Sequence, residues 1–316
     1  MTLLLSEADV SGLLNMREVV GAVEETFKQQ AASRSLNSPR TRSAVPGSSL
    51  NVMHASLPYL GRAGVKCYQS SKKGTKFLFV LFDTGDGSPL AVMGANVLGR
   101  NRTGATSAVA TKYLFPAKEV VLGLCGSGWQ ALTQVLALQE VTSVNEVRVW
   151  SPTPKHREAF ALELSGRGIR SKPSGSPSEA LRGADVGSTI TSSESGFIGA
   201  EAVDDVKHLN ACGSNSTERA EVLPSAIAKF ETIVVDDLAQ ARYEAGDLLM
   251  AEKAGSFTWE KALELKDFVS GKAKPEGKTF FKSHGAAIED VAVASLVYEK
   301  AVKAGGYMSV ELTLTP

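Results

Sequence analysis

The chain has 316 residues, of which 43% are hydrophobic, so it is long enough and apolar enough for two globular domains. Lysine plus arginine and aspartate plus glutamate number 34 each, which leaves no net charge to attract nucleic acid or an anionic membrane. The cysteines, Cys67, Cys125 and Cys212, lie far apart without a C-x-x-C pair, so we expect neither a disulfide framework nor a metal site. No secretory leader or membrane-spanning run is recognised, and we expect a cytoplasmic protein.

The first third of the chain predicts helices followed by short strands. Apolar residues recur at helical spacing from Ser6 to about Ala32, and Ser6 is a plausible helix cap. The pattern then changes to short β-like runs that Pro and Gly interrupt, at residues 50–54, 64–68 and 76–82. The turn signal at residues 83–87 predicts that the last of these runs pairs antiparallel with residues 90–93.

From Pro116 onward, strands and helices alternate. Strands are predicted at residues 120–125, 147–150, 186–191, 208–212 and 232–235, with helical segments between them. This alternation is typical of an α/β domain with a doubly wound parallel sheet. The stretch 286–304 is again apolar at helical spacing and predicts a last long helix.

The most informative motif is the glycine turn that follows the strand at residues 120–125. Gly126 and Gly128 allow a tight turn and a close approach of the backbone to a pyrophosphate, and Ala131 permits close packing of the next helix. The motif therefore predicts a Rossmann-type dinucleotide site, although an ordinary glycine-rich strand-to-helix turn is the alternative. The residues predicted to bind the cofactor here are Gly126, Ser127, Gly128, Trp129 and Gln130.

The end of the second strand indicates which dinucleotide is bound. NAD-binding folds carry an Asp or Glu there for the ribose hydroxyls, but this chain has Ser151, Thr153 and Arg157 after Trp150. Hydroxyl and cationic groups suit a 2′-phosphate, so NADP(H) is preferred over NAD(H). The alternative is a helix-starting loop with a solvated basic first turn.

Several segments together resemble the ornithine cyclodeaminase/mu-crystallin family, which includes ketimine reductases and archaeal alanine dehydrogenases. They occur in family order across nearly the whole chain. The resemblance implies a homodimer. It also implies an α+β substrate-binding and dimerisation domain at residues 1–115, completed by the C-terminal helix at 291–316, and a dinucleotide domain at 116–290. The matching segments are 39–42, 52–55, 64–66, 101–105, 108–114, 126–131, 208–213, 244–247, 281–285 and 288–290.

The resemblance also implies roles for individual residues. Arg42 would clamp a substrate carboxylate with its two-pronged donor, and Lys66 would be the catalytic proton donor and a second substrate contact. Met53, Glu244 and Asn215 would line the substrate site. Cofactor contacts would include Arg102, Thr103, Thr191 and Ser283.

One departure from the family pattern bears on the reaction. Members that cyclise ornithine or lysine carry an acid where this chain has Asn215, and an amide cannot accept the proton that the cyclodeaminase reaction releases. Glu218 is the nearest carboxylate. We therefore expect an NAD(P)H-dependent reductase acting on a small imino acid, either a cyclic ketimine or the imine of a 2-oxo acid.

Two alternatives stay open at this point. One is an ornithine or lysine cyclodeaminase, and the other is a mu-crystallin-like binding protein loaded with NADPH. Neither His54 nor His284 lies at metal-ligand spacing, and a structural role is favoured for both over that of a proton donor.

Overall fold

The computed structural model describes residues 1–312 of the chain and divides into two compact units. Unit 1 contains residues 1–102 and the segment from 285 onward, and unit 2 contains residues 103–284. Helix α3 (Asn96–Leu114) begins in unit 1 and continues into unit 2. The predicted functional division into residues 1–115 with 291–316, and residues 116–290, stays a prediction, and its last four residues lie outside the described part of the chain.

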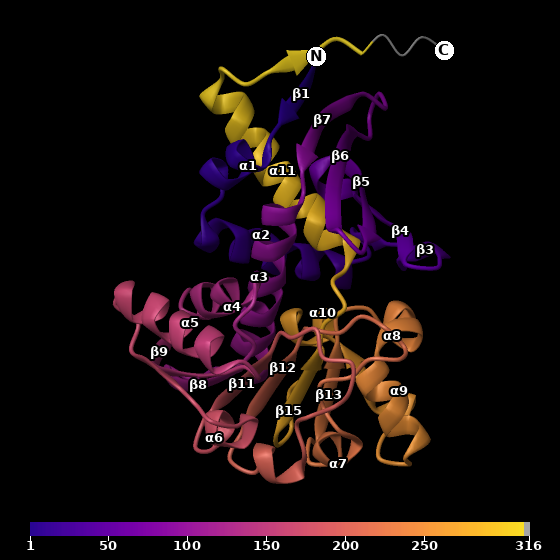
Figure 1. Cartoon of the computed structure of the whole chain (residues 1–316). Coiled ribbons are helices and arrows are strands. Elements are labelled where there is room, and N and C mark those ends of the chain that lie inside the picture. The colour runs from indigo at the N-terminus through magenta and orange to yellow at the C-terminus, as the bar shows by residue number, and fades with distance from the viewer. Residues whose placement is uncertain (313–316) are drawn as a thin grey trace. The chain divides into compact units, whose positions relative to one another are not determined.

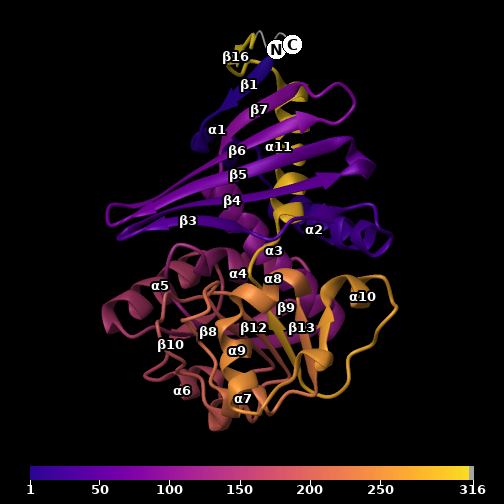
Figure 2. The same ribbon diagram turned by 90° about the vertical axis from the view of Figure 1, so that its right-hand side faces the viewer.

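Unit 1 is built on one mixed sheet with the strand order β16-β1-β7-β6-β5-β4-β2, and β3 also pairs with β4. Strands β4 to β7 form an antiparallel meander, which Figure 2 shows with α11 behind it. Besides α3, the elements of unit 1 are β1 (Thr2–Leu5), α1 (Glu7–Leu13), α2 (Met16–Ala31), β2 (Leu36–Asn37), β3 (Thr41–Val45), β4 (Ser48–Leu57), the 3₁₀ turn η1 (Pro58–Leu60), β5 (Arg62–Ser71), β6 (Gly74–Asp83), β7 (Pro89–Gly94), α11 (Ala287–Ala304) and β16 (Ser309–Val310).

The helices predicted between Ser6 and about Ala32 are confirmed as α1 and α2, but the strand that precedes them was not predicted. Residues 2–5 form strand β1, which pairs parallel with β7. The stretch that follows is two helices, because Leu14 is extended and the Asn15 side chain accepts a hydrogen bond from the Glu18 amide. Asn competes for backbone groups inside a helix and is favoured at its N-cap, so the helical pattern is interrupted there.

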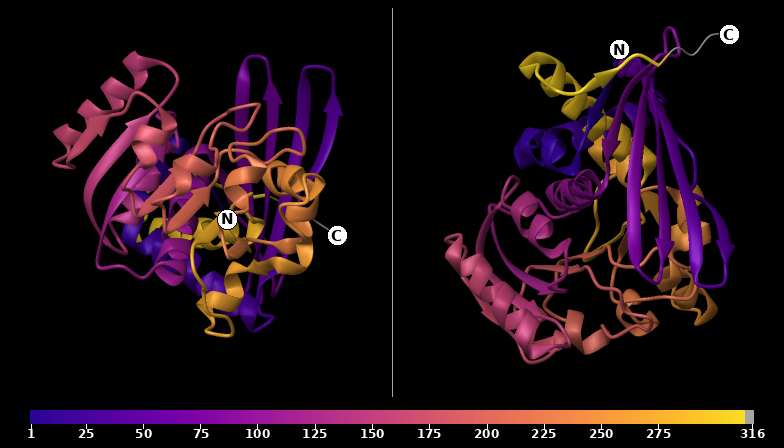
Figure 3. Two further views of the ribbon diagram at one scale, coloured as in Figure 1. Left: turned by 90° about the horizontal axis from the view of Figure 1, so that it is seen from below. Right: turned by 45° about the horizontal axis from the view of Figure 1, so that its top comes forward.

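The meander has one face packed and one face partly open. Along β4 the side chains of Asn51, Met53, Ala55 and Leu57 are buried, and the alternate positions are more exposed. Helix α11 packs against β4, β5 and β6. Figure 3 shows the long hairpins of this sheet from two further directions. The predicted antiparallel pairing of the strands around residues 83–87 is confirmed as β6 with β7.

Unit 2 is a doubly wound sheet in which every paired strand is parallel, in the order β10-β9-β8-β11-β12-β15-β13-β14. Helices cover both faces of this sheet (Figure 1). Besides the C-terminal part of α3, its elements are β8 (Glu119–Cys125), α4 (Ala131–Leu138), β9 (Ser143–Trp150), α5 (Pro154–Gly166), β10 (Ser171–Pro173), α6 (Pro177–Leu181), β11 (Val186–Thr189), η2 (Ala200–Val203), β12 (His208–Ala211), α7 (Pro224–Ile227), β13 (Thr232–Val235), α8 (Leu238–Glu244), α9 (Gly246–Lys253), η3 (Trp259–Lys261), β14 (Ala262–Glu264), α10 (Leu265–Val269) and β15 (Thr279–Lys282).

The order of the first five strands decides where a ligand is expected. The chain proceeds from β8 outward to β9 and β10, then returns to the other side of β8 with β11 and β12. This 3-2-1-4-5 order is that of dinucleotide-binding sheets, which bind at the carboxyl ends of the strands where the order reverses. The predicted fold class is confirmed. Within residues 1–312, no helix is both long and apolar enough to cross a membrane.

Candidate functional site

Unit 2 has a cavity of about 720 Å³ at the carboxyl ends of β8, β9 and β11. A cavity of this size at the switch point of a parallel sheet is the expected place for a dinucleotide. It is lined by Gly126, Ser127, Gly128, Trp129, Gln130, Trp150, Ser151, Pro152, His156, Ile190, Thr191, Ser192, Ser193, Ser195, Phe197, Gly213 and Arg219.

The glycine turn after β8 forms the floor of this cavity. Gly126 has a φ of +131°, and a Cβ there would lie 2.5 Å from the carbonyl oxygen of Ile190, so only glycine fits. A Cβ at Gly128 would meet nothing within 4 Å, so the missing side chain leaves open space beside the backbone. Helix α4 begins directly after the turn, and helix N-termini favour phosphate. The turn therefore fits the pyrophosphate of a dinucleotide.

Polar groups at the end of β9 form the neighbouring wall. Ser151 is buried, and its Oγ accepts a hydrogen bond from Ser127 Oγ at 3.0 Å. Arg157 Nη1 donates to the carbonyl oxygen of Ser151 at 2.9 Å, which fixes this arginine beside the wall. Thr153 is the N-cap residue of α5 and, like Arg157, is not among the lining residues. His156 and Arg219 are the basic side chains of the lining, and no Asp or Glu of the described chain belongs to it.

Three aromatic side chains also line this cavity, namely Trp129, Trp150 and Phe197. The rings of Trp150 and Phe197 lie 5.1 Å apart between centroids at an interplanar angle of 36°. Trp129 is 55% exposed. Flat apolar surfaces of this kind suit an aromatic base.

A second polar site lies within unit 1, on the packed face of the meander. Met53 on β4, Lys66 on β5, Phe79 on β6 and Met93 on β7 are direct cross-strand partners, and all four are buried. The ammonium group of Lys66 is therefore surrounded by apolar neighbours on its own sheet. Its ionic partner comes from helix α11, which packs on this face.

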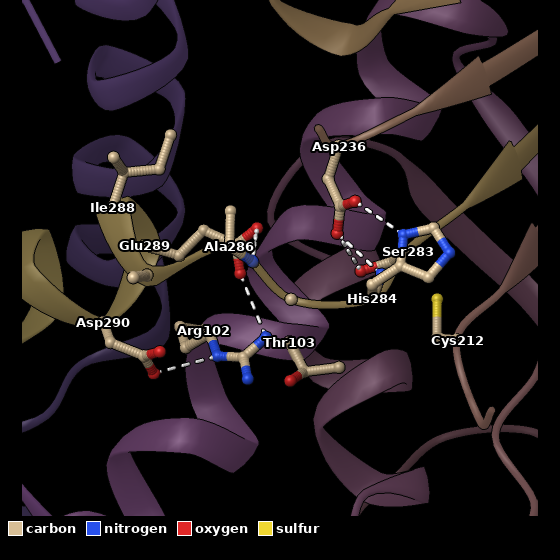
Figure 4. A network of polar contacts seen from close by, with 12 residues as sticks. Arg102, Thr103, Cys212, Asp236, Ser283, His284, Ala286, Ile288, Glu289 and Asp290 are labelled. Atoms are coloured by element: carbon tan, nitrogen blue, oxygen red, sulfur yellow. Dashed lines mark hydrogen bonds and ion pairs between the residues drawn. The ribbon is translucent and has the colours of Figure 1, made fainter. Parts of the chain in front are cut away.

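Two carboxylates at the start of α11 bind the cations of this site. Lys66 Nζ donates to Asp290 Oδ2 at 2.6 Å, and Arg102 Nε donates to Asp290 Oδ1 at 3.1 Å. Arg102 Nη1 also donates to Glu289 Oε2 at 3.0 Å, and Glu289 Oε1 accepts from the Ala286 amide at 3.2 Å. Figure 4 shows Arg102 between these two carboxylates. We call Lys66, Arg102, Glu289 and Asp290 the unit 1 ion cluster.

Burial sets the proton affinity in this cluster. Removal of Lys66 from water lowers its pKa to about 8, and the opposing pull of Asp290 only partly compensates. Burial alone would raise the pKa of Asp290, but the charges of Arg102 and Lys66 outweigh it and hold that pKa below its usual range. Lys66 is thus a lysine that can release or take up a proton near neutral pH.

Arg42 lies on the same sheet face as Lys66. It pairs with Asn51 across β3 and β4, and Asn51 is two residues from the buried Met53. Arg42 is exposed, and its Nε donates to Asn51 Oδ1 at 3.1 Å. The buried Arg40 lies near the start of β3, with its Nη2 3.5 Å from the carbonyl oxygen of Gly285. The face thus combines an exposed guanidinium with a buried lysine.

Several predicted site residues lie elsewhere in unit 2. Ser283 is buried after β15, and its hydroxyl donates to Asp236 Oδ2 at 3.1 Å. Asp236 also binds the amide and Nδ1 of His284 (Figure 4). Thr103 is buried in α3, and Glu244 is buried at the end of α8, where it accepts from Gln240 Nε2 at 2.9 Å. Asn215 lies exposed on the loop after β12.

The structure brings some of the predicted site residues together and places others apart. The cavity in unit 2 brings together Gly126, Ser127, Gly128, Trp129, Gln130, Ser151 and Thr191, and the sheet of unit 1 places Arg42, Met53 and Lys66 on one face. Arg102, predicted to contact the cofactor, is bound by two carboxylates in unit 1. The roles of all these residues stay predictions.

Sequence reasoning missed the acidic residues that hold these sites together. Asp290 belonged only to a matching segment, and no role was predicted for Glu221, which bonds the cavity residues Thr191 and Gly213, or for Asp247, which accepts from the Glu221 amide. Acids at the start of a helix are common for electrostatic reasons alone, so the motif at residues 288–290 gave no separate signal. Among the residues that the structure describes, no three His, Cys, Asp or Glu side chains gather as a group that could hold a metal ion.

Comparison with known proteins identifies a family and relatives that span nearly the whole chain. The model of the ornithine cyclodeaminase/mu-crystallin family matches residues 1–305. The chain is 35% identical to an alanine dehydrogenase of Archaeoglobus fulgidus over 95% of both chains.

Two solved structures resemble the whole chain closely. The Δ(1)-pyrroline-2-carboxylate reductase of Thermococcus litoralis, in complex with NADH and L-proline, superposes with a TM-score of 0.92 at 30% identity. It covers 98% of this chain and 100% of that one. An archaeal alanine dehydrogenase dimer with bound NAD gives a TM-score of 0.92 at 31% identity, over 98% and 99% of the two chains.

Proposed function

Because this chain belongs to the ornithine cyclodeaminase/mu-crystallin family, we propose that it is a nicotinamide-dependent reductase of 2-imino acids, with NADPH as the preferred cofactor. The observation that carries the proposal is the buried Lys66, whose pKa is lowered to about 8 by burial and which shares a sheet face with the exposed Arg42. A carboxylate anchor and a titratable ammonium are the two groups that an imino acid requires. The reductase of Thermococcus litoralis supports the reaction class, since its structure contains NADH and the amino acid product of an imine.

The proposed mechanism assigns separate tasks to the two units. In unit 2 the glycine turn would hold the pyrophosphate of the cofactor, whose nicotinamide would supply hydride for the carbon of the C=N bond. In unit 1 Arg42 binds the substrate carboxylate through its planar pair of N–H groups. Lys66 donates the proton that balances the reaction to the imine nitrogen, and where the imine arrives already protonated the ammonium group is a charged contact to the substrate carboxylate. Hydride plus proton converts the imine to an amine.

The preference for NADPH rests on the wall of the cavity after β9. A carboxylate there would bind ribose hydroxyls and repel a 2′-phosphate, but this position is the buried Ser151, and the lining includes the basic His156 and Arg219. The two similar solved structures contain NADH and NAD, so the preference concerns this chain's own residues.

A homodimer is the proposed assembly, and the outer face of the meander is the proposed contact. On this face Val52, Cys67 and Leu78 are cross-strand neighbours, and Leu78 is 43% exposed. Val65, Val80 and Val92 form the next row and are only half-buried. An apolar sheet face of this kind is normally covered by a second layer, and a second copy of the chain would supply it. The archaeal alanine dehydrogenase of the comparison is a dimer.

The test of this function is a cofactor-oxidation assay. NADPH or NADH is supplied with Δ(1)-pyrroline-2-carboxylate, with Δ(1)-piperideine-2-carboxylate, or with pyruvate and ammonium, and the loss of reduced cofactor is followed. We expect turnover with at least one imine and faster turnover with NADPH. Release of ammonia from ornithine, without oxidation of NADPH by any imine, would refute the proposal and favour a cyclodeaminase. Tight NADPH binding without any turnover would favour a binding protein.

A further inference from the structure

One buried carboxylate joins two walls of the unit 2 cavity. Glu221 is fully buried and accepts four hydrogen bonds. Its Oε1 accepts from the amide and the hydroxyl of Thr191, both at 2.7 Å. Its Oε2 accepts from Thr189 Oγ1 and from the Gly213 amide, both at 2.8 Å. These donors lie at the carboxyl ends of β11 and β12, so a single side chain bonds both strand ends.

Two of these partners, Thr191 and Gly213, line the cavity. The contact is close at Gly213, where a Cβ would lie 2.3 Å from Glu221 Oε1 and 2.4 Å from the amide nitrogen of Thr191. Any side chain at position 213 would therefore push the loop away from Glu221 and Thr191. The position of this part of the cavity depends on Glu221.

Further buried groups hold Glu221 in place. Asp247 Oδ1 accepts from the amides of Glu221 and Val222 at 2.7 and 2.8 Å. Lys282 Nζ lies 2.8 Å from Asp247 Oδ2, and both side chains are fully buried. Burial would lower the pKa of Lys282, but Asp247 and Glu221 outweigh it and raise that pKa, so the lysine stays charged. The ammonium thus offsets part of the charge of the two carboxylates.

We propose that Glu221 is a positioning residue for the cofactor, which orders Thr191 and Gly213 for contact with the dinucleotide and is itself held by Asp247 and Lys282. The inference rests on the proposed function, because it takes the cavity to be the cofactor site. All four groups bound to Glu221 are used as donors, and the two amides among them cannot accept. A glutamine at this position would turn its NH₂ group toward an amide donor in either orientation of the side chain. The four donors around the side chain of residue 221 can therefore all be satisfied only by a carboxylate.

The experiment measures the dissociation constants of NADPH and NADH for the wild-type protein and for Glu221→Gln, by quenching of the fluorescence of Trp129 and Trp150 in the cavity wall. We expect the variant to bind both cofactors about tenfold more weakly, because a donor is left unpaired. At saturating cofactor the fall in kcat should be smaller than the loss of cofactor affinity, because Glu221 touches no reacting atom.

Asp185→Asn is the matched control. Asp185 precedes β11, and its Oδ2 accepts from the Val121 amide at 2.9 Å, so the change also removes a carboxylate that binds a backbone amide of unit 2. Because it lies at the amino end of the strand, opposite the cavity, Asp185→Asn should leave both dissociation constants unchanged. If both variants weaken cofactor binding equally, Glu221 has only a general structural role and the inference is overturned.

A pH profile supplies a readout that a general loss of stability would not change. Burial raises the pKa of Glu221, and the charged groups that act on it are Lys282 and Asp247. Wild-type binding of NADH, which has no 2′-phosphate to titrate, should weaken as the pH falls and Glu221 gains a proton. Binding by Glu221→Gln should be independent of pH in the same range. Parallel profiles for the two proteins would overturn the inference.

A second variant decides the question if Glu221→Gln does not fold. Thr189→Val removes one donor to Glu221, and Thr189 does not line the cavity. We expect its dissociation constants to rise by about threefold. Unchanged cofactor binding would overturn the inference. If the wild-type protein binds neither cofactor, the proposed function itself fails. If it binds them and the variants bind equally well, only the inference about Glu221 fails, so the two failures are distinguishable.

Discussion

Asp290 is expected to control the protonation of Lys66, and the change Asp290→Asn tests this. In the wild-type protein burial lowers the pKa of Lys66 to about 8, and Asp290 keeps it from falling further. Under the proposed mechanism Lys66 donates the proton for imine reduction, so kcat/KM should decline as the pH rises through about 8. Without the carboxylate, the decline should begin at a lower pH.

The size of the shift follows from the geometry of the pair. Lys66 Nζ and Asp290 Oδ2 lie 2.6 Å apart, with the two side chains 3% and 0% exposed. Unit charges about 4 Å apart attract by about 4 kcal/mol at an effective dielectric constant near 20. At about 1.4 kcal/mol for each pH unit this is about three units, and reorganisation around the amide will reduce it. We expect a downward shift of at least about one unit.

The assay is a profile of kcat/KM against pH with NADPH and a cyclic ketimine, for the wild-type protein, Asp290→Asn and the control Glu18→Gln. Glu18 pairs with Lys300 at 2.6 Å on the surface of unit 1, so its removal should not move the profile. If titration of the substrate causes the decline in kcat/KM, the decline will lie at the same pH in all three proteins. That result would refute the assignment of the decline to Lys66, even if Asp290→Asn lowered the rate.

Three further predictions concern the substrate, the cofactor and the assembly. Arg42→Lys should raise the KM for the imine about tenfold or more with a smaller effect on kcat, because a point charge replaces a two-pronged donor, and initial rates at varied imine concentration would show it. An unchanged KM would remove Arg42 from the substrate site. Ser151→Asp should weaken NADPH binding by about tenfold or more while leaving NADH binding within about threefold, which titrations with both cofactors would measure. Equal losses for both cofactors would contradict the proposed place of the 2′-phosphate. Leu78→Glu should convert a dimer to a monomer in analytical ultracentrifugation, since the outer sheet face would then carry a charge, and a dimer that persists would exclude this face.

The fold was predicted well where local sequence patterns dominate. The glycine turn, the first strands of the parallel sheet and the last helix each have a short-range signal, and each is present as β8, α4, β9 and α11. Strand β1 was missed because residues 2–5 are a short apolar run with no alternation, whose partners β7 and β16 are distant in sequence. Asn15 was missed as a boundary because the apolar periodicity continues on both sides of it.

The site was predicted unevenly for a similar reason. Residues of the glycine turn are adjacent in the chain, so one motif identifies most of the cavity floor. Lys66 and Asp290 are 224 positions apart, and their pairing depends on how α11 packs on the meander. Glu221 is likewise recognised only when β11 and β12 are side by side. Neither acid could be assigned a partner from spacing alone.

The two networks together also bear on which reaction the protein performs. A cyclodeaminase needs a carboxylate that is free to take a proton from an amine, and the position where its family relatives carry that acid is here the exposed Asn215. The buried Asp290 and Asp247 are poor bases, because the neighbouring cations outweigh burial and hold their pKa values low. Glu221 already accepts from four donors. Reduction of an imine needs a proton donor and no such base, and the proposed donor Lys66, with a pKa of about 8, would supply that proton near neutral pH.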